Sequence, residues 1–462
     1  MNLVFLGGGS YRIPSIIRGA LGEGLLDGGQ VRLVDRVVDR VRTVGHLIER
    51  CPEFAGRDCR VSWGDDLDAA LDGADALYVT MAVGSPAVLA ASGRASAEHG
   101  FLSSDQLSLT GSMLGLTAGP AILDFARRME QRCPDARLLC FANPVPIYAG
   151  LVCNHTAIDA LGLCAGFTNH RWDLPRLMGL GDYDDRFELE VAGVNHLSYI
   201  VGGTHAGRSF YEVMEPHLQN FDAPVPPLGP EHRHVAEYVG PALRLLREIY
   251  RLYGVVVFST EGDGMAHLRW DRVAAEAREK AARAGANAGA GAKLDRDSEQ
   301  ARNALDRKMR ELADAAGDAA FWRNDPPRSL AADTTSVSIM ALRAMAGQAQ
   351  RIVASRPNAG AIAGIKDRTV VEYSMRVDRA TAEPTGRFEL PDGLHGLTAD
   401  LALHQTMMGD AIATEDPRLL AAALLGYPMQ RDTAEARSLS RTLLKVHEPQ
   451  IPAWTQRAAD FL

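Results

Sequence analysis

The stretch NLVFLGGGSYRIP (residues 2–14) decides the fold of this chain. Its apolar first half is typical of a buried strand, three consecutive glycines follow, and a helical pattern begins near Pro14. A second apolar run, VRLVD (31–35), comes after that helix. The two runs and the helix between them predict a strand–helix–strand unit of about thirty residues.

The glycine turn is a candidate dinucleotide site. Glycines between a strand and a helix allow a tight turn and let backbone N–H groups approach a pyrophosphate. Arg12 stands where the third glycine of the usual pattern would be. Asp35 stands where a carboxylate binds the adenosine ribose and repels a 2′-phosphate, which favours NAD over NADP. The alternative is a glycine turn in an ordinary α/β fold. The candidate cofactor residues are Gly7, Gly8, Gly9, Ser10, Tyr11, Arg12 and Asp35.

The alternation of strand and helix patterns continues along the first part of the chain. ALYVTMA (76–82) and ARLLCFAN (136–143) are further apolar runs, and each follows a stretch with helical spacing. This alternation predicts an α/β fold with a Rossmann-like, doubly wound, mostly parallel sheet. We expect an NAD-binding domain over residues 1–185.

The pattern changes in the second part of the chain. FELEVAGVNHLSYIV (187–201) predicts one or two antiparallel strands, and helical patterns cover 233–253 and a helix pair at 397–429. Residues 275–320, which are rich in alanine and charge, predict exposed helices around a flexible tip. We expect residues 186–462 to form a mixed α+β domain for substrate, metal and oligomerisation.

Composition excludes several classes of partner. The chain has 462 residues, 46% of them hydrophobic, and a net charge of −9, which gives no electrostatic reason to bind nucleic acid or a membrane surface. The six cysteines have no metal-finger or disulfide-framework spacing. The amino terminus lacks the features of a signal peptide, so we expect a cytoplasmic protein.

The chain resembles glycoside hydrolase family 4, the NAD- and metal-dependent glycosidases, along nearly its whole length. The motifs that carry the resemblance are GGGSYRIP (7–14), FANPVPI (141–147), GLCAGFTNH (162–170), GVNHLSY (193–199), NAGAIAGI (358–365), TVVEYSMRVD (369–378) and the helical stretch 397–429. The resemblance implies a fold like that of the lactate and malate dehydrogenases.

The resemblance also implies an unusual role for NAD, which is reduced and reoxidised in each turnover. NAD oxidises sugar carbon 3 to a ketone, a base removes the acidic hydrogen from carbon 2, and the substituent at carbon 1 is expelled. Water then adds and hydride returns. A divalent cation, usually manganese, acts as the Lewis acid that stabilises the enediolate. This route differs from the two-carboxylate mechanism of most glycosidases.

The family motifs imply roles for individual residues. Cys164 and His196 match the two protein ligands of the metal. Asn143 and Asn195 would bind sugar hydroxyls or orient the ligands, and Asn143 would also contact the cofactor. Taken singly, Cys164 would be a buried core thiol and His196 a hydrogen-bonded core histidine. The paired motifs favour metal ligation for both.

The base lies in a segment with a weaker signal. REIYRLYG (247–254) resembles a family segment in which an acidic residue precedes a tyrosine by two positions, so Glu248 and Tyr250 are the candidates. Two residues apart on a helix do not share a face, so at most one of them should point into the site. Tyr238 is a reserve candidate.

Three departures from the family pattern indicate a divergent member. Ala165 stands where many members carry a residue that assists the leaving group. The stretch after the third family strand contains only Arg94 and no acidic pair, which disfavours a 6-phosphorylated substrate. The glycine-rich loop expected before the next helix reads LSLTGSMLGLTAGP (107–120), without a basic residue.

Three functions remain distinguishable at this point. The leading one is a glycosidase that acts on a small-molecule glycoside as a homodimer or homotetramer. The second is an NAD-dependent dehydrogenase of a sugar or hydroxy acid, which would accumulate NADH. The third is an NAD-bound sugar sensor that has lost catalysis, which Ala165 makes conceivable but which has little need of a thiolate–imidazole metal site.

Overall fold

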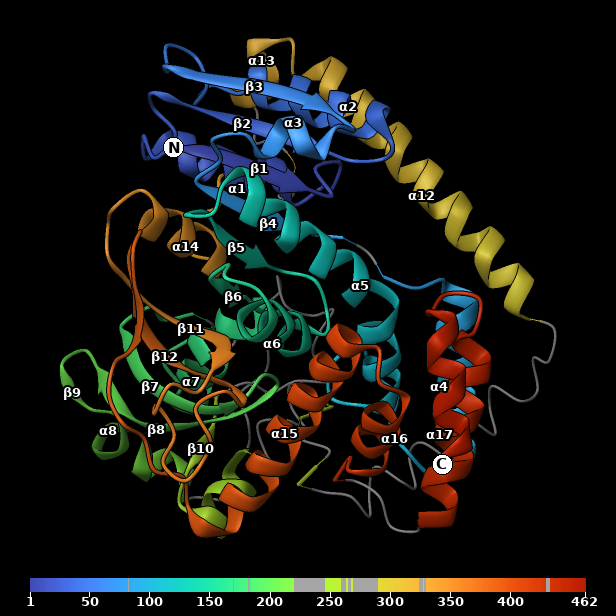
Figure 1. The fold of residues 1–462 in the computed structure, drawn as a ribbon. Helices are drawn as coiled ribbons and strands as arrows, with labels where there is room; N and C mark the ends of the chain where they lie inside the picture. Colours follow the sequence, from blue (N-terminus) through green and yellow to red (C-terminus); the bar gives the residue numbers. More distant parts are fainter. Residues whose placement is uncertain are drawn as a thin grey trace.

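A single 13-stranded sheet runs through the molecule, with a parallel half and an antiparallel half (Figure 1). The computed structural model describes residues 1–81, 83–168, 170–181, 183–219, 246–258, 263–264, 267–268, 290–323, 327, 330–428 and 433–462.

The parallel half has the strand order β3-β2-β1-β4-β5-β6. This is the order of the dinucleotide-binding fold, so the predicted Rossmann-like sheet is confirmed. Its helices fill the connections, with α1 between β1 and β2 and α2 between β2 and β3. The strands are β1 (Asn2–Leu6), β2 (Gly29–Val34), β3 (Cys59–Gly64), β4 (Ala76–Val79), β5 (Arg137–Cys140) and β6 (Ala160–Gly162).

The antiparallel half continues the same sheet in the order β6-β11-β12-β7-β8-β10. The two halves join where Ser355 of β11 pairs with Gly162 of β6. The segment 187–201, for which the sequence predicts one or two antiparallel strands, falls in two strands that pair with each other as a hairpin. The strands are β7 (Phe187–Val194), β8 (Leu197–His205), β9 (Arg208–Ser209), β10 (Val256–Val257), β11 (Gln350–Pro357), β12 (Val370–Val377) and β13 (Ala382–Pro384).

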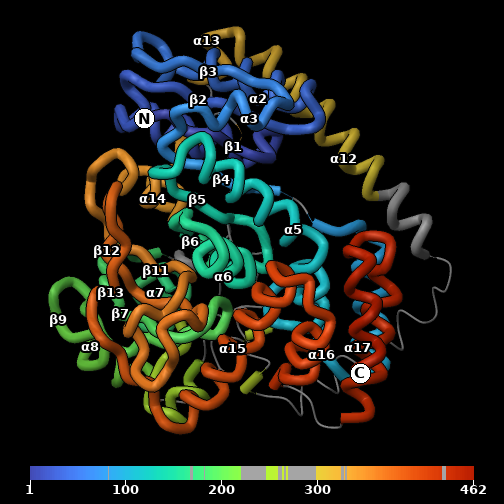
Figure 2. The backbone as a smooth tube through the Cα atoms, in the orientation of Figure 1, coloured from blue at the N-terminus to red at the C-terminus, as the bar shows by residue number. Residues whose placement is uncertain are grey.

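Helices pack against the sheet along its length (Figure 2). The predicted pair at 397–429 is α15 followed by α16, and α15 packs on α5 and α6. The helices are α1 (Ile13–Gly22), α2 (Val38–Glu49), α3 (Leu67–Leu71), α4 (Pro86–Glu98), α5 (Leu109–Arg132), α6 (Val145–His155), α7 (His170–Leu177), α8 (Phe210–Leu218), α12 (Ala290–Ala315), α13 (Ala319–Arg323), α14 (Val337–Met345), α15 (Asp392–Thr414), α16 (Pro417–Leu425) and α17 (Thr433–His447).

The glycine-rich stretch 107–120 is helical, and our interpretation of it as a loop was wrong. Its glycines recur every four residues along α5 and so share one face. A Cβ on Gly115 would lie 3.0 Å from Ile147 Cδ1, and one on Gly119 would lie 2.8 Å from Ile412 Cδ1. The glycines therefore let α5 pack closely on α6 and α15.

The described side chains of helix α12 are mostly exposed, as predicted for 275–320, but two of them are buried; residues 275–289 lie outside the described residues. One face of α12 packs on α2 and α4. Met309 and Ala313 are buried in a small apolar cluster with Leu47 and Leu330. The sequence did not reveal this buried face, because it consists of only a few apolar residues within a stretch rich in alanine and charge.

The segment after α12 also packs on the first strand–helix–strand unit. Ser15 of α1 accepts a backbone hydrogen bond from Asp333 at 3.0 Å, and Arg343 forms an ion pair with Glu23 at 2.5 Å. The amino-terminal unit is therefore enclosed by residues from the carboxyl-terminal half. In the described part of the chain, every helix is too short or too polar to cross a membrane.

We predict that Gly19→Ala destabilises the protein, because its Cβ would lie 1.8 Å from the backbone oxygen of Asp333. We expect a loss of about 2 kcal/mol or more in the free energy of unfolding, measured by urea denaturation. Gly22→Ala, at the end of the same helix, is the control. Its Cβ would lie 3.7 Å from Glu53, so the change should be neutral or stabilising by about 0.5 kcal/mol. Equal effects of the two substitutions would contradict this packing.

Candidate functional site

The glycine turn is held tightly between β2 and β4. The backbone N–H groups of Gly7 and Gly8 both donate to the Val34 carbonyl at 2.9 Å. Gly7 has a φ of +79°, and a Cβ there would lie 2.0 Å from the Thr80 carbonyl oxygen. Only glycine satisfies both the backbone angle and the lack of space.

Gly9 has no side chain beside Asp35, the acid that directly follows β2. A Cβ on Gly9 would lie 3.3 Å from Asp35 Oδ2 and 2.6 Å from Arg40 Cβ. The other carboxylate oxygen, Oδ1, accepts a hydrogen bond from the Val37 N–H at 2.9 Å. The turn and Asp35 thus meet, as the sequence predicts for the adenosine ribose position.

The three residues after the glycines point in different directions. The Ser10 N–H donates to the Gly7 carbonyl at 2.9 Å and closes the turn. The Tyr11 hydroxyl donates to Asp306 of α12. Arg12 is exposed at the start of α1, with its guanidinium 5.6 Å from the centre of the Phe141 ring.

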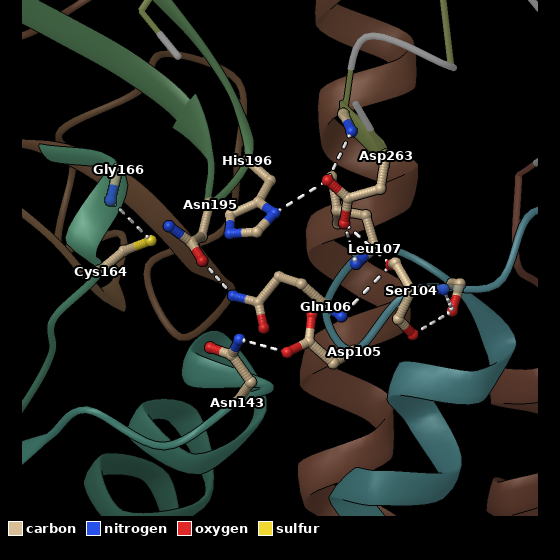
Figure 3. Close-up of polar contacts among 12 residues, drawn as sticks. Ser104, Asp105, Gln106, Leu107, Asn143, Cys164, Gly166, Asn195, His196 and Asp263 are labelled. Atoms are coloured by element: carbon tan, nitrogen blue, oxygen red, sulfur yellow. Dashed lines mark hydrogen bonds and ion pairs between the residues drawn. The ribbon is translucent and has the colours of Figure 1, made fainter. Parts of the chain in front are cut away.

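A second group of polar residues lies at the tip of the β7–β8 hairpin (Figure 3). Val194 pairs with Leu197, so the turn has only two residues, Asn195 and His196. His196 has a φ of +69°, which is uncommon for a residue with a side chain and occurs often at functional sites. The tight turn therefore projects both side chains from the end of the hairpin.

The structure brings Cys164 and His196 together. Cys164 is half-buried two residues beyond β6, and its Sγ accepts a hydrogen bond from the Gly166 N–H at 3.3 Å. The Cys164 thiol lies close enough to His196 to be among the causes that raise the pKa of that imidazole. Because Nδ1 of His196 is bonded elsewhere, Nε2 is the ring nitrogen left to face the thiol.

Asp263 orients His196. One of its carboxylate oxygens lies 2.8 Å from His196 Nδ1, and both side chains are about nine-tenths buried. Burial lowers the pKa of His196, but the Asp263 carboxylate and Cys164 outweigh burial and hold that pKa well above its usual value. Burial would raise the pKa of Asp263, but His196 and neighbouring donors hold it well below its usual value. The raised pKa of His196 and the lowered pKa of Asp263 both favour an ion pair between the two side chains.

Asn195 is held by a buried carboxylate behind it. Its amide nitrogen donates to Glu372 Oε1 at 2.7 Å, and Ser198 donates to Glu372 Oε2 at 2.8 Å. Its amide oxygen accepts a hydrogen bond from Gln106. Burial raises the pKa of Glu372, although both donors oppose that rise. Asn195 thus has its orientation set from two sides.

The loop 104–107 joins the separate parts of this site. Ser104 Oγ and the Leu107 N–H donate to Asp263 at 2.8 and 3.0 Å. Asp105 accepts a hydrogen bond from Asn143 Nδ2 at 2.8 Å, next to the cis Asn143–Pro144 bond. Gln106 contacts Asn195, as described above. One loop therefore positions both asparagines and the carboxylate partner of His196.

Sequence reasoning missed Asp105, Gln106, Asp263 and Glu372. The only signal for the loop is its run of polar side chains just before Ser108, which caps α5 by accepting a hydrogen bond from Gly111. Glu372 had a stronger signal, because it is the only acid in the strand segment VVEYSMRV and follows two apolar residues, and a buried acid needs a partner. Asp263 lies on a short described segment whose approach to His196 depends on the fold.

The structure places the candidate bases elsewhere. Tyr250 lies against α8, where its hydroxyl donates to Glu215 at 3.3 Å and its ring stacks on Tyr211. Burial and Glu215 raise the pKa of Tyr250, which opposes a role as a base in this arrangement. Glu248 is exposed on the same helical segment. Tyr238 lies outside the described residues.

The residue that follows Cys164 cannot assist the leaving group, because alanine has no proton to donate. Ala165 is exposed at the start of the 3-10 turn Ala165–Thr168. His170 is buried and stacks on Phe258 with ring centres 4.9 Å apart. Asn169 lies outside the described residues.

The arrangement favours a cation held by few protein atoms. Among the described residues, no group of three His, Cys, Asp or Glu side chains has the geometry of a metal site. A thiolate and an imidazole nitrogen would leave several coordination positions open for hydroxyl oxygens. The glycine turn, Asn143 and Cys164 follow β1, β5 and β6, so all three lie toward the carboxyl edge of the parallel strands.

Comparison with known proteins gives a consistent picture. The family model described as Family 4 glycosyl hydrolase matches residues 2–179, and the model of the C-terminal domain of that family matches 191–429. A probable 6-phospho-beta-glucosidase of Bacillus subtilis (strain 168) is 23% identical over 462 residues, covering 98% of this chain and 97% of the relative. An alpha-galactosidase of the same organism is 30% identical over 107 residues, 23% of this chain and 24% of the relative.

A solved structure shares the fold over nearly the whole length. It is a 6-phospho-alpha-glucosidase from gut microorganisms in complex with NAD and Mn2+, with a TM-score of 0.77 and 16% identity. The match covers 98% of this chain and 99% of that chain. At this identity the likeness shows the fold alone.

We predict that Cys164→Ala and His196→Ala each abolish binding of Mn²⁺, measured by the electron paramagnetic resonance signal of the free ion. Asp263→Asn should weaken binding by about 10- to 100-fold, because the amide orients the imidazole less well. Because Asp263 raises the pKa of His196, the cation must displace a proton, so affinity should fall as pH falls. Cys153→Ala, at another half-buried cysteine, is the control. Unchanged binding by Cys164→Ala would contradict the assignment.

Proposed function

The chain belongs to glycosyl hydrolase family 4, and on that basis we propose that it is an NAD- and divalent-metal-dependent glycosidase. We propose that it cleaves by transient oxidation at sugar carbon 3, elimination of the substituent at carbon 1 and addition of water. The observation that carries the proposal is that Cys164, Asn195 and His196 lie together in one site (Figure 3), in a fold whose carboxyl edge also bears the glycine turn.

We assign the dinucleotide to the glycine turn, which fits it. Gly9 lacks the Cβ that would fill the space beside Asp35, and Asp35 would accept hydrogen bonds from the adenosine ribose. The residues that would hold NAD are Gly7, Gly8, Gly9, Ser10, Tyr11, Arg12, Asp35 and Asn143.

We assign the divalent cation, proposed to be manganese, to Cys164 and His196. When bound, NAD supplies a reversible hydride acceptor, and the cation supplies a positive charge that stabilises sugar oxygens. The donor set fits, because Asp263 fixes the Nδ1 side of His196 and leaves Nε2 on the side of the thiol.

The chain's own residues would orient the sugar. The amide of Asn195 is fixed by Gln106 and Glu372, and the amide of Asn143 is fixed by Asp105. Amides with a set orientation can distinguish hydroxyl donors from acceptors, which holds a sugar ring in one pose. Asp263 accepts four hydrogen bonds, so it serves to position His196 rather than to take a proton from substrate.

The base remains a proposal between Glu248 and Tyr250. In the contacts described above neither residue reaches Cys164 or His196. A base role for either one therefore requires that its segment approach the sugar when substrate binds.

We predict that hydrolysis in heavy water leaves deuterium on carbon 2 of the released sugar, detected by NMR, because a carbon 3 ketone makes that hydrogen exchangeable. NAD should be required without net reduction. Glu248→Gln or Tyr250→Phe should suppress exchange while NAD and Mn²⁺ still bind, whichever residue is the base. A product without deuterium at carbon 2 would exclude the route, and accumulation of NADH would indicate a dehydrogenase.

We also predict that the substrate is an unphosphorylated glycoside, although the Bacillus subtilis relative described above is named for a 6-phosphoglycoside. Arg94, half-buried on α4, is the only cationic side chain in the stretch VGSPAVLAASGRASAEHG. Nitrophenyl glycosides with and without a 6-phosphate, assayed with NAD, Mn²⁺ and a reductant, would test this. We expect a higher kcat/KM for the unphosphorylated member of each pair, and the reverse order would refute the prediction.

A further inference from the structure

Helix α12 reaches the dinucleotide turn from the far half of the chain. In Figures 1 and 2 its carboxyl-terminal end lies beside α2, and the rest of the helix extends away from the amino-terminal strands. Its Asp306 is separated from Tyr11 by 295 positions in sequence. A pocket at this contact is lined by Gly9, Tyr11, Asp39, Arg40, Thr43, Val44, Asp306, Met309 and Arg310.

Asp306 engages the guanidinium of Arg40 with both carboxylate oxygens. Arg40 Nη2 donates to Oδ2 at 2.9 Å, and Nε lies 3.0 Å from Oδ1 and 3.1 Å from Oδ2. Tyr11 donates its hydroxyl to Oδ1 of the same carboxylate. The Asp306 side chain is only 15% exposed and that of Arg40 32%, so water screens this pair less than an open surface pair.

Arg40 stands at the place where the two forms of the cofactor differ. Its Cβ and Cδ flank Gly9, and Asp35 Oδ2 lies on the same side of that glycine. Asp35 is the acid expected at the ribose 2′-hydroxyl, where NADP instead carries a phosphate. A free arginine fork at this position would bind a phosphate in two-point fashion. The fork of Arg40 is instead directed toward α12.

We infer that Asp306 determines the choice of NAD over NADP by occupying Arg40. The inference rests on the proposed function, because it assumes that the glycine turn binds a dinucleotide. Asp35 repels the 2′-phosphate directly, and Asp306 occupies Arg40, a cationic partner beside Gly9 that would compensate. Asp306 is thus a specificity-determining residue supplied by the other half of the chain.

The test measures dissociation constants of NAD and NADP by isothermal titration calorimetry on the full-length protein. The variants are Asp306→Asn, Asp306→Ala, Arg40→Gln and the double variant with Asp306→Asn and Arg40→Gln. Glu311→Gln is the matched control, because it removes one negative charge from an exposed position of α12. Thermal unfolding of each variant establishes that it folds.

Asp306→Asn and Asp306→Ala should raise NADP affinity relative to NAD by about tenfold or more, the scale of one charge-assisted hydrogen bond. Arg40→Gln in the double variant should cancel the gain, and Glu311→Gln should leave the ratio unchanged. Suppose that the wild-type protein binds NAD but the Asp306 variants keep the same ratio of NADP to NAD affinity, or lose affinity for both cofactors equally. Either result would overturn this inference and leave the proposed function standing. A wild-type protein that binds neither dinucleotide would overturn the proposed function as well.

Discussion

One row of paired residues across four neighbouring strands fixes how the two halves of the sheet fit together, and the rest of the structure depends on it. Gly162 of β6 pairs with Ser355, Ser355 with Glu372, and Glu372 with Gly193 of β7. A Cβ on Gly162 would lie 2.5 Å from Val145 and 3.0 Å from the Ser355 Cβ, so the junction leaves no room for a side chain. This row joins the parallel half of the sheet to the antiparallel half, and Cys164 and Asn195 each lie two residues beyond one of its ends.

The two buried carboxylates near this row have opposite electrostatic roles. Asp263 has a cationic partner in His196, so its charge is compensated where it is buried. Glu372 has the neutral donors Asn195 and Ser198, and burial raises its pKa. A buried charge without a cation is costly, whereas a buried acid that accepts two hydrogen bonds gives orientation at a smaller cost. The site therefore holds the His196 imidazole by charge and orients the Asn195 amide by hydrogen bonds.

The amino-terminal unit depends on the carboxyl-terminal half in a comparable way. Gly19 lies against the backbone of Asp333, and Arg40 is paired with Asp306. Residues that would meet the cofactor are thus supported by contacts formed late in the chain. A separation into domains near residue 185, as the sequence suggests, describes the change of pattern, but these contacts and the continuous sheet cross that position.

The sequence by itself determined the Rossmann-like parallel sheet, the presence of antiparallel strand structure over 187–201, the final helix pair and the family, because each depends on periodicity or on residues adjacent in sequence. Asp263, Glu372 and the loop 104–107 required the tertiary structure, since their partners lie far along the chain. The glycines spaced by four in 107–120 were interpreted as a loop because glycine in a sequence usually indicates a turn. Only the packed structure shows that they make room for the neighbouring helices. The pairing of Asp306 with Arg40 depended on the docking of α12, and docking is decided by surfaces that meet only after the chain has folded.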